Sequence, residues 1–300
     1  MCIRDRPFST GVIGEPMPIE PFDRSLPQLV KQLEESQWGR ASRAIMTTDT
    51  QPKLRSRQFR LADGRECVLT GMSKGAGMIK PDMATMLAFI ATDAPVAKTD
   101  LQSFLASAVN VSFNAITVDG DTSTNDACVI AATGMAGGDP ICPQSSQGDI
   151  FAAELTALLQ ELAKGIVRDA EGATRFIEVC VEGATDLAEA RKVAYTVAES
   201  PLVKTAAFAG DPNWGRILAA VGRSGIAALD VDSVSLWLDK VCLVQNGQPH
   251  PEYTEASGAT VAGQAEFQIR ISLGRGDIST RVWTCDYSYD YVKINAEYRS

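Results

Sequence analysis

Histidine is almost absent from this chain. The single residue of this type, His250, lies between Pro249 and Pro251, in a segment typical of a surface turn rather than a buried site. Nucleophilic catalysis by a Ser-His-Asp or Cys-His group would have to use it. The shortage therefore favours a nucleophile that is activated without histidine.

Paired cysteines are also lacking. The seven cysteines are scattered, and none forms a CxxC pair. This spacing fits neither a zinc site nor a small disulfide scaffold, so no metal is expected. Apolar neighbours, as around Cys128, favour reduced core thiols in a cytosolic protein, with a catalytic cysteine as the alternative.

Long apolar runs and an excess of positive charge are missing too. No stretch approaches the roughly 20 apolar residues of a membrane span, and the charged residues 1–6 are not followed by the apolar core of a signal peptide. The net charge of −9 argues against a nucleic-acid surface. The 300 residues, 45% of them hydrophobic, suffice for a globular enzyme built as one large domain or two interlocked halves.

Helical and strand patterns are mixed without a regular alternation, which predicts an α+β fold with helices packed on sheets. Apolar spacing predicts helices at 27–38, 100–109, 150–167, 187–197 and 212–221. Strands are expected at 43–50, 58–61, 67–70, 85–92, 113–118, 127–132, 176–181, 233–238, 241–244, 266–273, 279–287 and 291–295.

The most informative segment is residues 74–87, where a Gly-rich stretch turns abruptly apolar. It presents Thr85, preceded by the small Ala84, at the start of a hydrophobic strand. Such a threonine could cut the bond before itself and act as an N-terminal nucleophile, with its freed α-amine, of pKa roughly 8, as the base. The alternative is a strand threonine on a buried face.

Three further candidates each have a plain structural alternative. Lys74 could pair with a substrate carboxylate or be solvated. Thr10 and Gly11 could supply a hydroxyl and a backbone N–H to an oxyanion, or form only a turn. Glu171 could hold a substrate ammonium, or could be a solvated acid at a helix end, where the dipole does not favour it.

Two patterns that suggest ligand sites fail on inspection. The Gly-rich stretch has Lys80 where a dinucleotide fingerprint has its third glycine, and it lacks the ending of a P-loop. The acidic segment 119–126 has Thr124 and Ile130 where an EF-hand has Gly and Glu. We interpret it as a polar turn that buttresses a site.

Residues 74–87 are similar to the self-cleavage segment of the ornithine acetyltransferase family, the glutamate N-acetyltransferases of arginine biosynthesis. Other segments agree with this family, in family order from about Ser9 to Ser300: 9–14, 113–126, 202–205, 210–216 and 291–298. The resemblance implies an α/β/β/α-type sandwich, shared with the self-processing aminopeptidases of the DmpA type.

The resemblance further implies cleavage between Ala84 and Thr85. The α piece would be residues 1–84, and the β piece, residues 85–300, would begin at the nucleophile. The pieces are expected to stay paired and to assemble into a heterotetramer. Thr10 and Gly11 match the oxyanion hole of the family, and its substrate-binding positions are matched by Thr47, Lys74, Thr85, Glu171, Asn295 and Ser300.

The implied reaction is a ping-pong acetyl transfer. N2-acetyl-L-ornithine offers a carboxylate to Lys74 and an ammonium to Glu171. Its acetyl group moves to Thr85, ornithine leaves, and the amine of L-glutamate takes the acetyl group. No cofactor, nucleic acid or membrane is implied, the enzyme is expected to be cytoplasmic, and some family members also accept acetyl-CoA.

Two alternatives stay open. A hydrolase of the same nucleophile class, an aminopeptidase or amidase, would use water in place of glutamate. Family members carry a substantial segment before Thr10 that this chain lacks, and residues 1–6 match nothing in the family. An inactive truncated remnant is therefore the second alternative.

Overall fold

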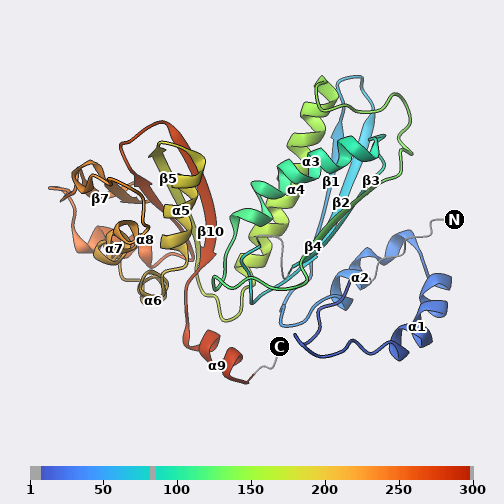
Figure 1. The fold of residues 1–300 in the computed structure, drawn as a ribbon, viewed down its shortest axis with the longest axis horizontal. Helices are drawn as coiled ribbons and strands as arrows, with labels where there is room; N and C mark the ends of the chain where they lie inside the picture. The colour runs from blue at the N-terminus through green and yellow to red at the C-terminus, as the bar shows by residue number, and fades with distance from the viewer. Residues whose placement is uncertain (1–7, 82–85, 298–300) are drawn as a thin grey trace.

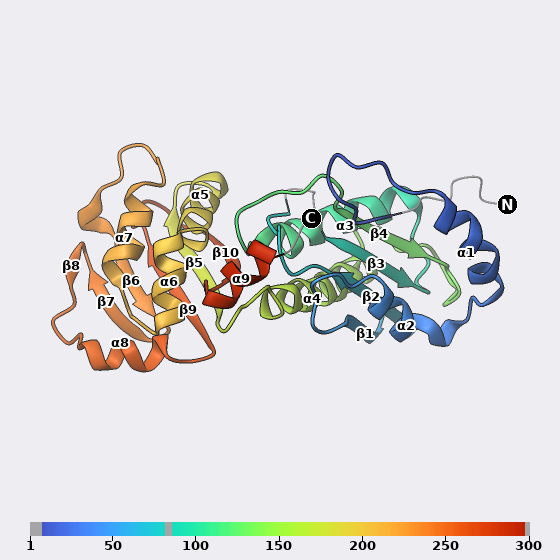
Figure 2. The ribbon, with the colours of Figure 1, turned by 90° about the horizontal axis from the view of Figure 1, so that it is seen from below.

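The structure, a computed structural model, describes residues 8–81 and 86–297. The chain forms two lobes that lie side by side, each built on a β-sheet with helices packed against it (Figure 1, Figure 2). The α+β class expected from the sequence is confirmed. Each helix within the described ranges is too short or too polar to cross a bilayer.

The first lobe contains, in the described residues, a four-stranded sheet in the order β1-β2-β3-β4. Its strands are β1 (Lys53–Arg60), β2 (Glu66–Lys74), β3 (Leu87–Thr92) and β4 (Ala127–Ala132). The first three are antiparallel, as the hairpin turn between β1 and β2 requires, whereas β4 runs parallel to β3. A parallel neighbour needs a crossover connection, which contains α3 (Lys98–Asn110).

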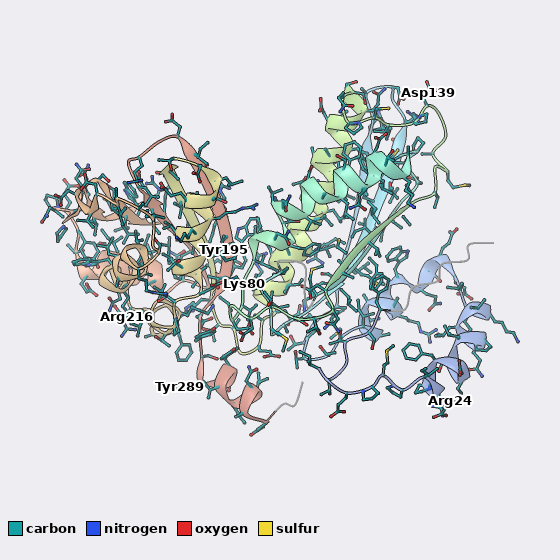
Figure 3. All side chains as sticks on the ribbon, in the orientation of Figure 1. Arg24, Lys80, Asp139, Tyr195, Arg216 and Tyr289 are labelled. Atoms are coloured by element: carbon teal, nitrogen blue, oxygen red, sulfur yellow. The ribbon has the colours of Figure 1, made fainter. Side chains whose placement is uncertain are left out.

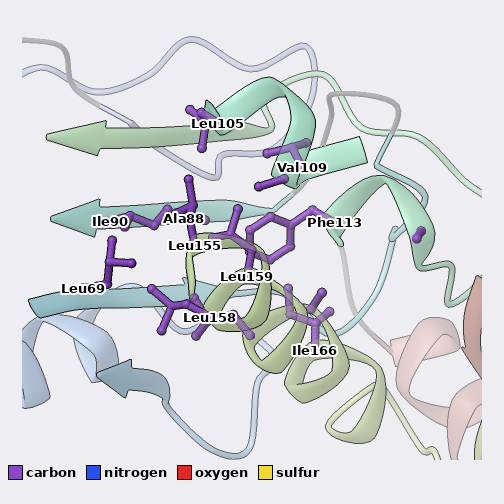
Figure 4. Packing of buried hydrophobic residues seen from close by; sticks show 14 of the residues in the cluster. Leu69, Ala88, Ile90, Leu105, Val109, Phe113, Leu155, Leu158, Leu159 and Ile166 are labelled. Atoms are coloured by element: carbon purple, nitrogen blue, oxygen red, sulfur yellow. The ribbon is translucent and has the colours of Figure 1, made fainter. Parts of the chain in front are cut away.

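The long helix α4 (Ser146–Arg168) packs on this sheet and confirms the predicted amphipathic helix. Ser145 caps its first turn, because its side chain accepts a hydrogen bond from the Gly148 N–H. The leucines of the helix face the sheet and are fully buried, each contributing about 1.5–3 kcal/mol (Figure 4). Gly71 lets them approach closely, since a Cβ there would lie 3.1 Å from Leu162.

The second lobe contains, in the part of the chain that is described, a sheet in the order β10-β5-β9-β6-β7-β8. These strands are β5 (Phe176–Ala184), β6 (Ser235–Leu238), β7 (Val241–Gln245), β8 (Gln248–Pro249), β9 (Glu266–Ser272) and β10 (Ile278–Cys285). The helices of this lobe are α5 (Leu187–Ala198), α6 (Pro201–Ala209), α7 (Trp214–Gly222) and α8 (Glu255–Ala262). Asp186 caps α5 by accepting a hydrogen bond from the Glu189 N–H, and the helix agrees with the one expected at 187–197.

Several other helices belong to the described residues, and some of them occupy segments for which the sequence predicted strands. They are α1 (Glu20–Lys31), η1 (Glu35–Gln37), α2 (Trp38–Ala44), η2 (Phe113–Ala115), η3 (Val231–Ser233) and α9 (Tyr289–Glu297). The strands predicted at 43–50, 113–118 and 291–295 were wrong: these segments hold the end of α2 and a loop, η2 and a bend, and α9. Short apolar runs do not distinguish strands from helices, and here the helix or turn prevailed.

Helix α9 lies close to the junction of the two lobes in both views (Figure 1, Figure 2). The Ser288 hydroxyl, just before the helix, donates a hydrogen bond of 2.6 Å to the Gly172 carbonyl, just after α4. This contact brings residues from near the C-terminal end of the chain to the polar edge of the first sheet.

Candidate active site

A cavity of about 80 Å³ lies beside the end of β2. Its lining comes from six separate parts of the chain and consists of Thr10, Gly11, Ile13, Thr47, Thr48, Lys74, Gly77, Met78, Ser123, Asn125, Glu171 and Asn295. The predicted site residues within the described ranges are all in this set, whereas Ala84, Thr85 and Ser300 lie outside the described residues. The tertiary structure thus gathers residues that are up to 285 positions apart.

Lys74 is the last residue of β2 and is only 2% exposed. Burial lowers its pKa, while the charges of Asp49 and Asp126 oppose this effect. Its ammonium forms no hydrogen bond or ion pair with any described residue, although the side chain lines the cavity. A buried cation without a direct partner is suited to an anionic group of a ligand.

The turn after Lys74 is held by a buried ion cluster that the sequence did not reveal. The Asp49 carboxylate accepts a hydrogen bond of 2.7 Å from the Gly75 N–H, and the Lys53 ammonium donates one of 3.1 Å to the Gly75 carbonyl. Lys53 is also paired with Asp49 and Asp169. Breaking a buried pair of this kind typically costs about 3–5 kcal/mol, so the position of Lys74 is strongly determined.

Asp49 connects the same cluster to the Thr47 side of the cavity. Its carboxylate accepts a hydrogen bond of 3.2 Å from the Thr47 N–H. Asp169 extends the cluster by accepting hydrogen bonds from the Thr50 N–H, at 3.0 Å, and the Gln51 N–H, at 3.2 Å. Two walls of the cavity therefore depend on one network of charges.

The acidic loop 119–126 supports the cavity from the other side. The Asp119 carboxylate accepts hydrogen bonds from the backbone N–H groups of Met78, at 2.7 Å, and Ile79, at 3.0 Å. Met78 has a positive φ of 54°, and these contacts stabilise that turn. The Asn125 side chain donates a hydrogen bond of 2.7 Å to the Ser9 carbonyl, next to Thr10. The interpretation of this loop as a buttress agrees with these contacts.

Glu171 follows α4 and is buried against the Gly-rich turn. A Cβ on Gly77 would lie 2.4 Å from Glu171 Oε2, so only glycine permits this close approach. The Asn295 side chain on α9 donates a hydrogen bond of 2.9 Å to the same carboxylate. Glu171 is therefore not the solvated helix end of the alternative interpretation, but an oriented carboxylate in the cavity wall.

Strand register places Met86 relative to Lys74. Lys74, Leu87 and Ala127 form one row across β2, β3 and β4. In the next row, the Met86 carbonyl accepts a hydrogen bond of 2.9 Å from the Ala127 N–H. Met86 therefore lies one row beyond Lys74, at the polar edge of the sheet.

Asp126 lies at this edge with neither carboxylate oxygen hydrogen-bonded to a described residue. Burial raises the pKa of Asp126 to about 7, against the opposing charge of Lys74. A carboxyl group whose pKa lies near neutrality is typical of functional sites, where stability is given up for chemistry. The sequence prediction assigned no role to it, because an Asp in a polar loop gives no sign of burial.

We expect Asp126→Asn to stabilise the fold at pH 8 and to have little effect near pH 4. The folded state keeps the proton between the unfolded pKa, about 4, and the folded pKa, about 7, so the native chain loses stability as the pH rises through this window. Although its carboxylate oxygens are buried, the residue as a whole is only half-buried, and we expect a gain of about 1 kcal/mol. Urea unfolding at several pH values measures it, with Asp121→Asn, an exposed residue of the same loop, as the control. A gain that does not depend on pH would contradict the assignment.

Histidine and cysteine take no part in the cavity lining of the described residues. His250 lies between β8 and α8, where its Nδ1 accepts a hydrogen bond of 3.2 Å from the Glu252 N–H, as a turn residue would. No group of His, Cys, Asp or Glu suited to a metal ion is found within the described ranges. The cavity thus offers one buried cation, one carboxylate, hydroxyls and amides.

Comparisons with known proteins agree with the resemblance. The model of the ArgJ family matches residues 5–300. The arginine biosynthesis bifunctional protein ArgJ of Methylococcus capsulatus is 56% identical over 297 residues, which are 99% of this chain and 72% of that protein. The protein of the same name from Pseudomonas fluorescens is 52% identical, and the match covers 98% of this chain and 73% of that protein.

Comparison with a solved structure supports both the fold and the family. The crystal structure of the arginine biosynthesis bifunctional protein ArgJ from Bacillus halodurans is similar with a TM-score of 0.69 and 39% identity. The match covers 71% of this chain and 100% of the solved one. Since the family model and these relatives match nearly the whole sequence, the chain belongs to the ArgJ family.

Proposed function

We propose that this chain is a glutamate N-acetyltransferase of arginine biosynthesis, which moves the acetyl group of N2-acetyl-L-ornithine to L-glutamate through an acetyl ester on Thr85. Membership of the ArgJ family supports the activity. The observation that carries the assignment of the site is a buried cation without a hydrogen bond, Lys74, and a buried, oriented carboxylate, Glu171, which line one cavity, with Lys74 one row from Met86 in the sheet.

The substrate fits this pair by charge. N2-acetyl-L-ornithine carries a carboxylate and a side-chain ammonium at opposite ends. Lys74 binds the carboxylate and Glu171 binds the ammonium, each by a charge-assisted hydrogen bond in a site of restricted solvent access. Thr47 and Asn295 line the same cavity, and Ser300 completes the set of proposed binding residues.

Thr85 becomes the nucleophile when the Ala84–Thr85 bond is cut. Its freed α-amine then acts as the base, which explains why the site needs no histidine. The solved relative supports this division of the chain: the whole of it corresponds to 71% of this sequence, a share similar to that of residues 85–300. Residues 1–84 would be the α piece and residues 85–300 the β piece.

The chemistry proceeds in two balanced half-reactions. Thr85 Oγ attacks the acetyl carbonyl carbon, and the α-amine of Thr85 takes the hydroxyl proton. The Thr10 hydroxyl and the Gly11 N–H stabilise the oxyanion. The hydrogen bond from Asn125 to the Ser9 carbonyl holds these two residues in place. The C–N bond then breaks, and the α-amine returns the proton to the departing ornithine. Glutamate repeats these steps in reverse as the attacking amine.

Three finer features belong to the same proposal. Acetyl-CoA serves as a second acetyl donor, in line with the word bifunctional in the names of the relatives. The α and β pieces remain paired and assemble into a heterotetramer. The enzyme works in the cytoplasm, which is supported by the free thiol state of every cysteine in the described ranges.

The proposal is tested by intact-mass measurement of the purified chain during turnover. The expected result is two fragments that meet at Ala84/Thr85, with one acetyl group on the β fragment after incubation with N2-acetyl-L-ornithine alone. Adding L-glutamate should remove this group and release N-acetylglutamate. Loss of the acetyl group to water at the same rate without glutamate would instead favour the hydrolase, and an uncut chain without acetylation would favour the inactive remnant.

A further inference from the structure

A second and larger cavity, of about 410 Å³, lies in the groove between the two lobes. The end of α3, η2 and α4 of the first lobe form one wall, and α5 with β10 of the second lobe forms the other. The groove shares no lining residue with the candidate active site. Its volume is within the range of small-molecule binding sites.

The charge of this groove is opposite to that of the whole chain. Three basic residues, Lys164, Arg191 and Arg281, are part of its lining and no acidic residue is, although the chain has 37 acidic and 28 basic residues. Within the described residues, Lys164 and Arg191 form no ion pair. Arg281 has only a distant one, with Nε 3.8 Å from Glu178 Oε1.

Glu178 compensates part of this charge, because its hydrogen-bond donors are neutral and leave its carboxylate charged. One of its carboxylate oxygens accepts a hydrogen bond of 2.8 Å from Trp283 Nε1, and the other accepts one of 2.6 Å from the Gln268 side chain. Glu266, which pairs with Arg168, also attracts Lys164, so the groove keeps an excess of positive charge that is compensated only in part.

Two of the three cations are held in position by the groove itself. The Lys164 ammonium lies 4.6 Å from the centre of the Trp283 ring. One Arg191 Nη donates a hydrogen bond of 2.9 Å to the Asn110 carbonyl, which leaves its other N–H groups for a ligand. Side chains that are already restrained lose less conformational entropy when they bind a ligand, so the groove is preorganised for an anion.

The walls also offer neutral donors and apolar surface. In the described part of the sheet, β10 is an edge strand that pairs on one side with β5. On its other side the Trp283 carbonyl accepts a hydrogen bond of 3.0 Å from the Thr117 N–H, and residues 279–283 line the groove. Val111 and Leu187, both 46% exposed, are apolar lining residues. These features suit a ligand that has an uncharged body as well as charged groups.

We propose that this groove binds a phosphate-bearing organic anion of nucleotide size. Each phosphate monoester carries about −1.5 to −2 charges at neutral pH and can take paired hydrogen bonds from a guanidinium. Two phosphates would balance the positive excess of the groove more fully than a monocarboxylate would. Because the cations come from α4, α5 and β10, the bound anion links the two lobes.

The groove is in contact with the loop that leads toward the active site. Tyr195 is part of its lining, and its hydroxyl donates a hydrogen bond of 2.7 Å to the Asn114 carbonyl. The Lys80 ammonium lies 5.6 Å from the centre of the Tyr195 ring, and Figure 3 shows the two residues together at the junction of the lobes. Lys80 follows the Gly-rich turn of the candidate active site. A ligand in the groove would therefore contact Tyr195, whose ring in turn faces Lys80.

Isothermal titration of the purified protein with ADP tests the proposal. We expect saturable binding that weakens as salt is added. Arg191→Gln and Lys164→Gln should each raise the Kd about tenfold or more, the loss expected for one hydrogen bond to a charged group. Arg24→Gln is the matched control, because Arg24 is an exposed residue of α1, far from the groove (Figure 3), and should leave the Kd unchanged.

A charge-conserving variant and competition experiments distinguish loss of phosphate recognition from damage to the fold. Lys164→Arg keeps the charge and should retain ADP binding, and inorganic pyrophosphate should compete with ADP, since the phosphates anchor the ligand. Absence of saturable ADP binding, or equal binding by the parent and both glutamine variants, would overturn the proposal. So would citrate competing as well as pyrophosphate, because the groove would then not select phosphate. None of these outcomes depends on acetyl transfer, so they test the groove separately from the proposed function.

Discussion

Replacing Thr85 with alanine is expected to leave the chain uncut and to lower the rate of acetyl transfer more than about 10³-fold. Removal of a covalent nucleophile leaves only binding and oxyanion stabilisation, which are small compared with the full catalytic effect. The same variant lacks the hydroxyl that attacks the preceding peptide bond, so both losses should occur together. Intact mass and a coupled assay of N-acetylglutamate formation measure them.

Two companion variants make this prediction specific. Thr85→Ser keeps a hydroxyl and should retain cleavage and part of the activity. Thr92→Ala changes a buried threonine at the other end of β3, whose side chain accepts a hydrogen bond from the Ala94 N–H, and should leave cleavage intact. Normal cleavage in Thr85→Ala, or loss of cleavage in Thr92→Ala without unfolding, would mean that Thr85 is only a strand residue.

Glu171→Gln is expected to lower kcat/KM for N2-acetyl-L-ornithine about 10- to 150-fold, mainly through a higher KM. The change removes one hydrogen bond to a charged group, worth about 1.5–3 kcal/mol, while the amide keeps the size of the side chain and can still accept from Asn295. Cleavage should proceed normally, because the charge acts on the substrate ammonium. Steady-state kinetics over a range of acetylornithine concentrations measure the effect.

The matched control for this variant lies on α4, the helix that precedes Glu171. Glu161→Gln on α4 removes a carboxylate that pairs with Arg57 outside the cavity, and it should leave kcat/KM unchanged. A similar loss in both variants would point to general damage to α4. An unchanged KM in Glu171→Gln would show that the ammonium is bound elsewhere.

The elements that were predicted well are those whose pattern is long or punctuated. Helices α4 and α5 follow from their apolar period, and the strands on either side of Gly64 follow from their residue types, signals that act within a few residues. The errors at 43–50, 113–118 and 291–295 concern short segments, where the neighbours in space decide between helix, turn and strand. α9 is such a case, since its position depends on contacts with the end of α4.

The candidate site divides in a similar way. The resemblance of residues 74–87 identified the segment around Thr85 and, with it, Lys74, Glu171 and Asn295, which the structure brings around one cavity. The ion cluster of Asp49, Lys53 and Asp169 was missed, because Asp169 is 116 positions from Lys53 and all three look like ordinary surface charges in the sequence.

By itself, then, the sequence determined the class of fold, the family, and a chemistry without histidine, because residue types and local order carry that information. Only the tertiary structure decided which charges are buried and which groups they face. Asp126 owes its raised pKa to burial, Lys74 owes its lack of a direct partner to its place at the end of β2, and the basic groove exists only where two lobes meet. Burial and long-range proximity are properties of the packed chain, since they depend on contacts between residues distant in sequence.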